Sequence, residues 1–285
     1  MKETILEMRR RLEPLYGAGE TQAMIREIFR NLKGWDATEL TIRIADDYQL
    51  SDYIRSKVEE ILTRLVRHEP LQYILGDADF YGIDIHVEPG VLIPRPETED
   101  LVRQIVEENT DSDLQVADLG TGSGAIAIAL SRYLNFPQIV AIDNSPVALK
   151  VAKENVDTLK CRNVEVEKGD ILHWEPEPNS LDIVVSNPPY VDESEKASME
   201  SNVKDYEPSE ALFVPDDDPL KYYRAIAPAA LSGLKPGGRL YFEINPRHAA
   251  ELSALLAKAG FADVETWRDE RGLNRYIKAR KPQDD

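Results

Sequence analysis

The stretch Val116-Ala117-Asp118-Leu119-Gly120-Thr121-Gly122-Ser123-Gly124-Ala125 decides the fold of this 285-residue chain. Its apolar beginning is typical of a buried strand, and its three glycines let the backbone turn sharply into a helix and pass close to a ligand. A glycine-rich loop between a strand and a helix is typical of a nucleotide-binding site. The sequence therefore predicts that this loop holds a nucleotide-containing cofactor.

Strands and helices alternate from Leu114 onward. The expected strands are 114–119, 138–142, 164–168, 181–185 and 239–244, and the expected helices are 125–133, 146–159 and 219–234. This alternation predicts an α/β fold, with a mainly parallel sheet and helices on both of its faces. Two later strands, 263–267 and 274–279, are joined by a short turn around Gly272, so we expect an antiparallel pair at the sheet edge.

Residues 1–72 lack this alternation and are expected to form a small helical domain that presents a docking surface to the substrate. Apolar residues recur at helical spacing over 24–32 and again over 54–65. Ser51 is a good N-cap for the second of these helices, and Pro70 is expected to end it.

Residues 73–95 are interpreted as a segment that connects two domains. A short β-hairpin is expected around Gly82, and the prolines of Pro94-Arg95-Pro96 predict a stiff, extended stretch. The α/β domain is expected over residues 96–285, beginning with a helix from about 97 to 108.

Composition excludes several classes of protein. The chain has one cysteine and four scattered histidines without metal-ligand spacing, so neither an intrachain disulfide nor a metal site is expected. No apolar run approaches the roughly 18 residues of a membrane span, and the charged N-terminus does not resemble a signal peptide, so a cytoplasmic protein is expected. The net charge is −18, and residues after 72 carry 22 basic against 39 acidic side chains. Because nucleic acids bind through clustered Lys and Arg, this acidity argues against a nucleic-acid substrate.

The glycine loop alone does not identify the cofactor. Gly120, Gly122 and Ala125 also fit the dinucleotide pattern G-x-G-x-x-G/A, so an NAD-dependent oxidoreductase remains open at this point. Asp143 ends the second strand, where a carboxylate can accept hydrogen bonds from both ribose hydroxyls.

Two further carboxylates favour S-adenosylmethionine. Asp118 lies two residues before the first glycine, where it can receive the methionine end of that cofactor through its ammonium group or a water. Gly169-Asp170 ends the third strand, where a carboxylate can contact the adenine amino group.

The turn Asn187-Pro188-Pro189-Tyr190, which follows the fourth strand, indicates the chemistry. Ligands of open α/β sheets bind beyond the carboxyl ends of the strands, so this turn is expected beside the glycine loop. Its prolines remove two backbone donors and leave the Asn187 side-chain oxygen and the Pro188 carbonyl as acceptors, while Tyr190 offers a flat face. Two acceptors can hold both hydrogens of a planar NH₂ group, with its lone pair directed at a methyl donor. No separate catalytic acid or base is required.

Asn-Pro-Pro-Tyr after such a loop resembles the methyltransferases that act on amide or exocyclic amino nitrogens. Four other segments are similar to the release factor glutamine methyltransferases (PrmC/HemK): 70–76, 92–99, 206–212 and 269–275. The resemblance runs over nearly the whole chain, and the Pro-Arg-Pro stretch is its most specific part.

The resemblance implies a seven-stranded, Rossmann-like methyltransferase domain that uses S-adenosylmethionine and releases S-adenosylhomocysteine. The implied substrate is the glutamine of the Gly-Gly-Gln motif of class I peptide chain release factors, methylated at N5 and held in part by the helical domain. Together with the positions proposed above, the expected cofactor contacts are Asp118, Gly120, Thr121, Gly122, Ser123, Gly124, Asp143, Asp170, Ile171 and Asn187. The amide is expected to bind Asn187, Pro188, Pro189 and Tyr190, with Asn187, Pro188 and Tyr190 as catalytic residues.

The chain departs from the family pattern after the fifth strand. Where the family usually has Glu-Ile-Gly followed three residues later by Gln, this sequence has Asn245 for the glycine and His248 for the glutamine. The alternatives are a glutamine methyltransferase for a ribosomal protein, an adenine-N6 methyltransferase, and a cofactor-binding module without catalysis. A monomer without direct nucleic-acid or membrane contact is expected.

Overall fold

A computed structural model describes residues 1–283 and divides them into two compact units. The first consists of Met1–Gly76 and Glu200–Tyr206, and the second of Asp77–Met199 and the described residues from Glu207 onward. The predicted boundaries, 1–72, 73–95 and 96–285, differ from these units in two respects. The hairpin of the connecting segment groups with the α/β unit, and seven residues from the second half of the chain group with the helical unit.

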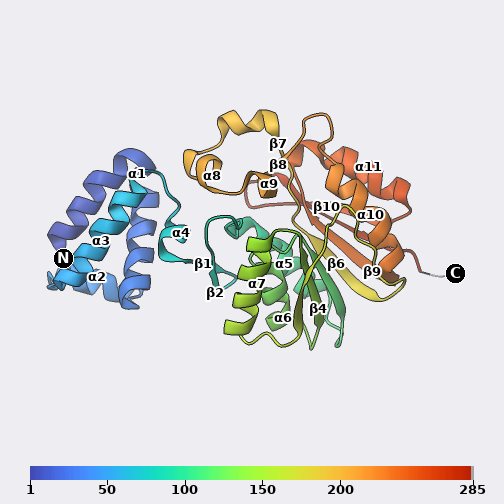
Figure 1. The fold of residues 1–285 in the computed structure, drawn as a ribbon, viewed down its shortest axis with the longest axis horizontal. Helices are drawn as coiled ribbons and strands as arrows, with labels where there is room; N and C mark the ends of the chain where they lie inside the picture. The colour runs from blue at the N-terminus through green and yellow to red at the C-terminus, as the bar shows by residue number, and fades with distance from the viewer. Residues whose placement is uncertain (284–285) are drawn as a thin grey trace. The chain divides into compact units, whose positions relative to one another are not determined.

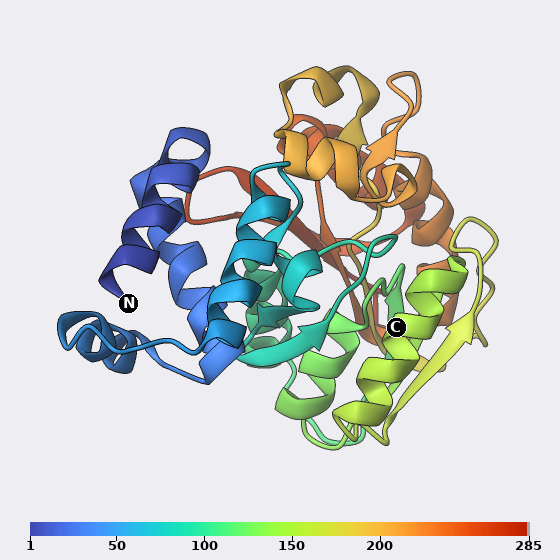
Figure 2. The same cartoon turned by 60° about the vertical axis from the view of Figure 1, so that its left-hand side comes forward.

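The first unit is helical, as predicted, and contains α1 (Lys2–Lys33), α2 (Ala37–Ala45), α3 (Asp52–Leu65), α4 (Leu71–Leu75) and α8 (Ser201–Tyr206). α1 is bent sharply into two segments (Figure 2). The bend is at Gly17, whose φ of 76° and ψ of 166° are not helical. The Arg9 guanidinium donates to Oε1 of Gln22 across this bend at 2.7 Å. In a straight helix these residues would be about 20 Å apart along the axis, so the two halves of α1 pack against each other.

The prediction that Pro70 ends the third helix was wrong. α3 starts after the Ser51 cap as predicted, but it ends at Leu65. His68 takes a left-handed φ of 63° and its N–H donates to the Leu65 carbonyl, so the chain leaves the helix before the proline is reached. Pro70 instead precedes the first turn of α4, where a missing N–H costs nothing.

The second unit begins with the predicted hairpin, formed by β1 (Asp77–Phe80) and β2 (Ile83–His86). Tyr81 and Gly82 connect the strands, both with positive φ (53° and 72°), as a tight two-residue hairpin turn requires. α5 (Pro96–Glu108) follows, with Pro96 in its first turn.

The sheet of the second unit has seven strands in the order β10-β11-β9-β6-β3-β4-β5. Five are parallel neighbours: β3 (Gln115–Leu119), β4 (Gln138–Asp143), β5 (Val164–Lys168), β6 (Leu181–Ser186) and β9 (Leu234–Glu243). β11 (Asn274–Arg280) is antiparallel to both β9 and β10 (Ala262–Arg268), which confirms the predicted pair at the edge. The order reverses at β3, because β4 and β5 lie on one side of it and β6 and β9 on the other.

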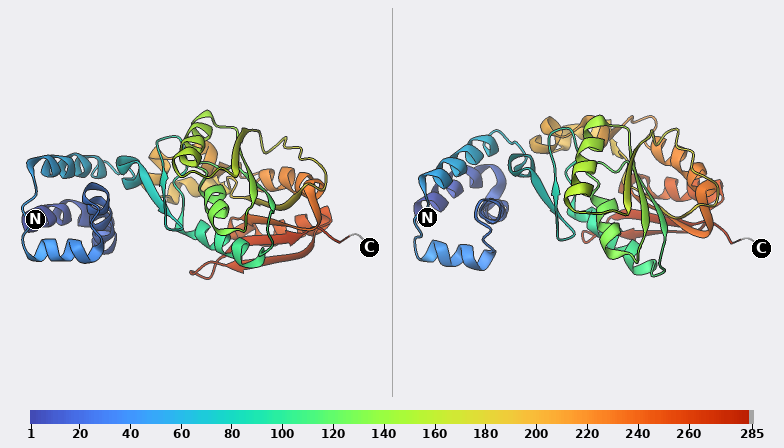
Figure 3. Two further views of the ribbon diagram at one scale, coloured as in Figure 1. Left: turned by 90° about the horizontal axis from the view of Figure 1, so that it is seen from below. Right: turned by 60° about the horizontal axis from the view of Figure 1, so that its bottom comes forward.

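Helices cover both faces of this sheet (Figures 1 and 3). α5, α6 (Ala125–Tyr133) and α7 (Pro146–Thr158) cover one face, and α10 (Lys221–Gly233) and α11 (Ala249–Ala259) cover the other. The core under α10 and α11 contains fully buried Tyr223, Ile226, Phe242 and Leu256. The predicted α/β fold class is confirmed, and the predicted bounds of α6 are those of the structure.

Several elements were not predicted from the sequence. They are α11, α9 (Ser209–Leu212), the short strands β7 (Val191–Asp192) and β8 (Phe213–Val214), and the 3₁₀ helices η1 (Glu193–Ser198) and η2 (Pro246–His248). Within residues 1–283, no helix is long and apolar enough to span a membrane. The same residues contain no cluster of three or more His, Cys, Asp or Glu side chains suited to a metal ion.

Candidate active site

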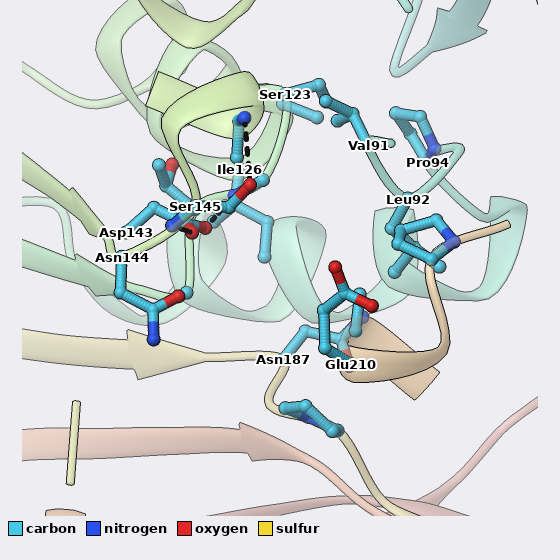
Figure 4. Close-up of a pocket in the computed structure, with 18 of the residues that line it drawn as sticks. Val91, Leu92, Pro94, Ser123, Ile126, Asp143, Asn144, Ser145, Asn187 and Glu210 are labelled. Atoms are coloured by element: carbon cyan, nitrogen blue, oxygen red, sulfur yellow. Dashed lines mark hydrogen bonds between the residues drawn. The ribbon is translucent and has the colours of Figure 1, made fainter. Parts of the chain in front are cut away.

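A pocket of the second unit lies beyond the carboxyl ends of β3, β4, β5 and β6, on both sides of the point where the strand order reverses. Its empty space is about 1070 Å³ with the open mouth included, which suits a ligand as large as a nucleoside joined to an amino acid. Figure 4 shows three of its walls, formed by Asp143, Asn144 and Ser145, by Val91, Leu92 and Pro94, and by Asn187 and Glu210. Such a position is where open α/β sheets bind their ligands.

The glycine loop lines this pocket. Gly120, Gly122 and Gly124 all have positive φ (74°, 57° and 83°), a region that other residues rarely adopt. The N–H groups of Gly120 and Thr121 both donate to the Ile142 carbonyl, at 2.8 and 2.9 Å. The loop is therefore tied to the end of β4. Of its predicted ligands, Gly120, Thr121, Gly122 and Ser123 line the pocket, whereas Gly124 does not.

Asp143 lines the pocket at the end of β4. Its Oδ2 accepts the N–H of Gly122 at 2.9 Å, and its Oδ1 accepts the N–H of Ser145 at 2.9 Å (dashed lines in Figure 4). Each carboxylate oxygen can accept more than one hydrogen bond. The side chain is thus fixed by backbone donors and keeps acceptor capacity for hydroxyl groups of a ligand.

Asp118 lies beneath the loop rather than on the pocket surface. It is fully buried, and its Oδ2 accepts the hydroxyl of Thr121 at 2.6 Å. Within residues 1–283, its Oδ1 has no hydrogen-bond partner. Burial raises the pKa of Asp118 to about 7, although the Thr121 hydrogen bond opposes the shift. An unpaired buried carboxylate oxygen under a ligand pocket fits an ammonium group or an ordered water.

The residues that follow β5 give the pocket an apolar surface rather than a carboxylate. Gly169 and Ile171 line the pocket, but Asp170 is not among the lining residues. The Asp170 carboxylate accepts the N–H of Leu172 at 2.9 Å and lies 2.9 Å from Nδ1 of His173, and the Leu172 bond is the main cause of its lowered pKa. The adenine contact of Asp170 stays a prediction.

The turn after β6 places Asn187 in the pocket wall with Pro189. Pro188 and Tyr190 are not lining residues. The Asn187 amide donates through Nδ2 to Oγ1 of Thr98 at 3.3 Å. Within residues 1–283, no hydrogen bond involves its Oδ1, so this oxygen keeps its capacity to accept one from a ligand.

Glu243 and Thr98 were not predicted from the sequence as site residues. Glu243 ends β9 and is 1% exposed, and its two oxygens accept the hydroxyls of Thr98 (2.6 Å) and Tyr190 (2.8 Å). Burial raises the pKa values of Glu243 and of Tyr190. Tyr190 therefore offers more than the flat face that the sequence suggested, because its hydroxyl fixes the turn to the sheet.

Arg95 and Glu207 hold another wall of the pocket. The buried Glu207 carboxylate accepts the N–H of Ile93 at 3.1 Å and the Arg95 guanidinium at 2.5 Å. These residues come from two of the family-like segments, 92–99 and 206–212. The structure shows that a buried ion pair joins the two segments.

The loop that departs from the family pattern contacts the chain that follows the Asn-Pro-Pro-Tyr turn. Asn245 donates through Nδ2 to the Tyr190 carbonyl at 3.1 Å and to Glu195 at 2.8 Å. Nε2 of His248 lies 3.0 Å from the Asp192 carboxylate. Both replacing residues thus anchor residues 190–195.

Family comparisons agree with this geometry. A model described as a methyltransferase domain matches residues 110–272, and a model described as the PrmC N-terminal domain matches residues 3–76. A solved structure from Pyrococcus horikoshii, described as a transferase, has a TM-score of 0.50 and 17% identity, and the match covers 73% of this chain and 72% of that one. At this identity the likeness concerns the fold alone.

Two relatives are much closer in sequence, and both bear the name release factor glutamine methyltransferase. The protein of Bacteroides thetaiotaomicron is 42% identical over 96% of this chain and 98% of its own length. The protein of Flavobacterium psychrophilum is 40% identical over 90% and 89%. By these identities and coverages, the chain, whose glycine loop, Asp143 and Asn187 line one pocket, belongs to the release factor glutamine methyltransferase family, whose members are S-adenosylmethionine-dependent protein-glutamine methyltransferases.

Proposed function

We propose that this protein transfers a methyl group from S-adenosylmethionine to the N5 amide nitrogen of the glutamine in the Gly-Gly-Gln motif of class I peptide chain release factors. The observation that carries the proposal is the free Oδ1 of Asn187 in the wall of the pocket that the glycine loop and Asp143 also line. The names of the close relatives support the substrate.

The pocket fits the cofactor in three places. Asp143 offers acceptors for the two ribose hydroxyls, Ile171 and Gly169 give an apolar surface for the adenine, and the unpaired Oδ1 of Asp118 lies below the loop for the ammonium group or a water. When bound, S-adenosylmethionine supplies an electrophilic methyl group on a sulfonium ion. Asp118 would then hold its methionine end and Asp143 its ribose.

Asn187 performs the main task on the substrate side. Its Oδ1 accepts one N–H of the glutamine amide, and the Pro188 carbonyl accepts the other, so that the nitrogen lone pair is directed at the methyl group. Holding two reacting groups in this way can lower the barrier by roughly 7–11 kcal/mol. As the nitrogen becomes cationic both hydrogen bonds strengthen, which stabilises the transition state more than the bound substrate. The alkylated amide then loses a proton readily, without a dedicated base.

The helical unit is proposed to hold part of the release factor outside the Gly-Gly-Gln loop. The acidic character of the chain favours a protein over a nucleic acid as substrate, since a net charge of −18 repels phosphate. We propose that the enzyme works in the cytoplasm as a monomer.

The proposal is tested by a methyl-transfer assay. Purified protein and labelled S-adenosylmethionine are mixed separately with unmethylated release factor, with ribosomal protein and with adenine-containing DNA. Label on the Gly-Gly-Gln glutamine, located by peptide mass spectrometry, is the expected result. A release factor whose Gly-Gly-Gln glutamine is replaced by alanine is the matched control and must take no label.

The other results separate the alternatives. Label on ribosomal protein alone would support methylation of a glutamine amide and would show that the substrate is a ribosomal protein rather than a release factor. Label on DNA would overturn the argument from charge. No label on any substrate, together with tight cofactor binding, would indicate a binding module.

A further inference from the structure

The side chain of Asn187 is the last member of a buried chain of hydrogen bonds. β6 and β9 are parallel neighbours, and Ser186 lies opposite Phe242, so Asn187, just after β6, and Glu243, the last residue of β9, follow at the same level. Between them lies Thr98, from the first turn of α5, whose hydroxyl is 2.6 Å from Oε2 of Glu243 and 3.3 Å from Nδ2 of Asn187. Thr98 is 4% exposed and Glu243 1% exposed, so little water competes for these bonds.

We propose that Glu243 and Thr98 are positioning residues that determine which end of the Asn187 amide faces the substrate. This inference rests on the proposed function, because it concerns how Asn187 receives the glutamine amide. Thr98 also lines the pocket and Glu243 does not, and both are proposed to act on the substrate through Asn187.

The donor-to-acceptor direction of these hydrogen bonds follows from counting the available protons. Glu243 accepts the hydroxyls of both Thr98 and Tyr190, so the single proton of the Thr98 hydroxyl is directed at Glu243. The Thr98 oxygen then has only lone pairs left for Asn187, and only the nitrogen of that amide can donate to them. The Asn187 oxygen therefore faces away from Thr98, which makes it available in the pocket wall. Without this constraint the amide could turn over and present two donors to a substrate group that is itself a donor.

Tyr190 gives independent support for the same role. Its hydroxyl donates to the other oxygen of Glu243 at 2.8 Å, so one carboxylate restrains the first and last residues of the Asn-Pro-Pro-Tyr turn. Each oxygen of Glu243 thus accepts one hydroxyl. One hydroxyl belongs to Tyr190 of the turn, and the other belongs to Thr98, which is hydrogen-bonded to Asn187 of the same turn.

The experiment compares three variants with the wild type. Thr98→Val keeps the shape of the side chain and removes the hydroxyl, whereas Thr98→Ser keeps the hydroxyl. Tyr223→Phe is the matched control. It removes a buried 2.9 Å hydrogen bond to the backbone carbonyl of Glu243 and leaves the hydrogen bonds that connect Glu243, Thr98 and Asn187 in place. For each variant kcat on release factor, the Kd for S-adenosylmethionine and the thermal midpoint are measured.

We expect Thr98→Val to lower kcat by about 100-fold, since a misplacement of about 1 Å at a reacting group can have that effect, with the Kd for the cofactor unchanged. Thr98→Ser should recover most of the loss, and Tyr223→Phe should lower the thermal midpoint but not kcat. Wild-type kcat in Thr98→Val, or an equal loss of kcat in Tyr223→Phe, would overturn the inference.

Neutron diffraction from deuterated wild-type crystals supplies a readout that needs no substrate. The inference requires deuterons on the Asn187 nitrogen that faces Thr98 and none on the pocket side. Deuterons on the pocket side would refute it. If the wild type fails to methylate release factor, the proposed function fails, while the neutron map still decides the orientation of Asn187.

Discussion

The backbone nitrogen of Gly122 lies 2.9 Å from Oδ2 of Asp143 and donates a hydrogen bond to it. This bond joins the glycine loop after β3 to the carboxylate that ends β4. The carboxylate thus holds the loop in place by a hydrogen bond and also lines the pocket. A change at Asp143 must therefore affect both the shape of the cofactor site and its contacts.

Replacing Asp143 by Asn should weaken the binding of S-adenosylmethionine. Asparagine has one acceptor oxygen, so one of the N–H groups of Gly122 and Ser145 loses its partner, and the ribose loses an acceptor. An unmet hydrogen bond of this kind costs about 1–3 kcal/mol, which corresponds to a rise in Kd of roughly 5- to 150-fold. Titration calorimetry measures the Kd. A variant with normal affinity and a defect only in kcat would contradict the ribose role.

Two of the loop glycines, Gly122 and Gly124, should differ in their sensitivity to alanine. At Gly122 a Cβ would meet nothing within 4 Å, so the cost of Gly122→Ala is the left-handed φ of 57°, about 1–2 kcal/mol. At Gly124 a Cβ would also lie 3.3 Å from the Ile128 side chain and 3.5 Å from Cβ of Ala152. Gly124→Ala should therefore destabilise by ~1 kcal/mol more through overpacking. Urea denaturation measures the free energy of unfolding of both variants. Equal losses in the two variants would argue against overpacking at Gly124.

Much of the fold could be predicted because local patterns specify it. The strand β5 and the helix α6 have the predicted bounds, since β5 alternates valine with charged residues and α6 begins with a continuous apolar run directly after Gly124. β9 begins five residues earlier than predicted, at Leu234. Its first half contains Pro236 and Gly237, which argue against a strand, but tertiary hydrogen bonds between Gly237, Gly238 and Lys281 hold it in place.

The site could be predicted only in part, for a physical reason. Gly120 to Ser123, Asp143, Ile171 and Asn187 line the pocket because they follow strands whose carboxyl ends meet. Thr98 and Glu243 are 145 positions apart in the chain, and nothing near either of them indicates that they share a hydrogen bond. Contacts of this kind depend on how α5 packs on the sheet, which no local pattern shows.

The buried carboxyl of Asp118 should make stability depend on pH. Its pKa is about 7 in the folded protein and about 3.9 in an unfolded chain. The folded state therefore binds an extra proton between these values, and stability falls as the pH rises through this window. Relative to Asp118→Asn, which cannot titrate, the wild type should lose up to about 4 kcal/mol between pH 4 and pH 8.

Urea denaturation over this pH range measures the difference between wild type and Asp118→Asn. A saturating concentration of cofactor should flatten the slope if its ammonium group pairs with Asp118, because the ionised form is then stabilised. A difference that does not change with pH would show that Asp118 is ionised throughout and that the unpaired oxygen finds a partner in solution.

The ion pair of Arg95 and Glu207 should stabilise the wall of the pocket. Glu207→Ala leaves the Arg95 guanidinium and the Ile93 N–H without their acceptor. Breaking a buried pair costs about 3–5 kcal/mol, and because the Arg95 side chain is 30% exposed we expect roughly 2–3 kcal/mol. The matched control is Glu60→Ala in the first unit, which removes an exposed pair with Lys57 and should leave stability nearly unchanged, because solvent screens exposed pairs. Because Leu92, Pro94 and Pro208 line the pocket, Glu207→Ala should also raise both the Kd for the cofactor and the KM for release factor. Unchanged binding with reduced stability would mean that the pair supports the fold without shaping the site.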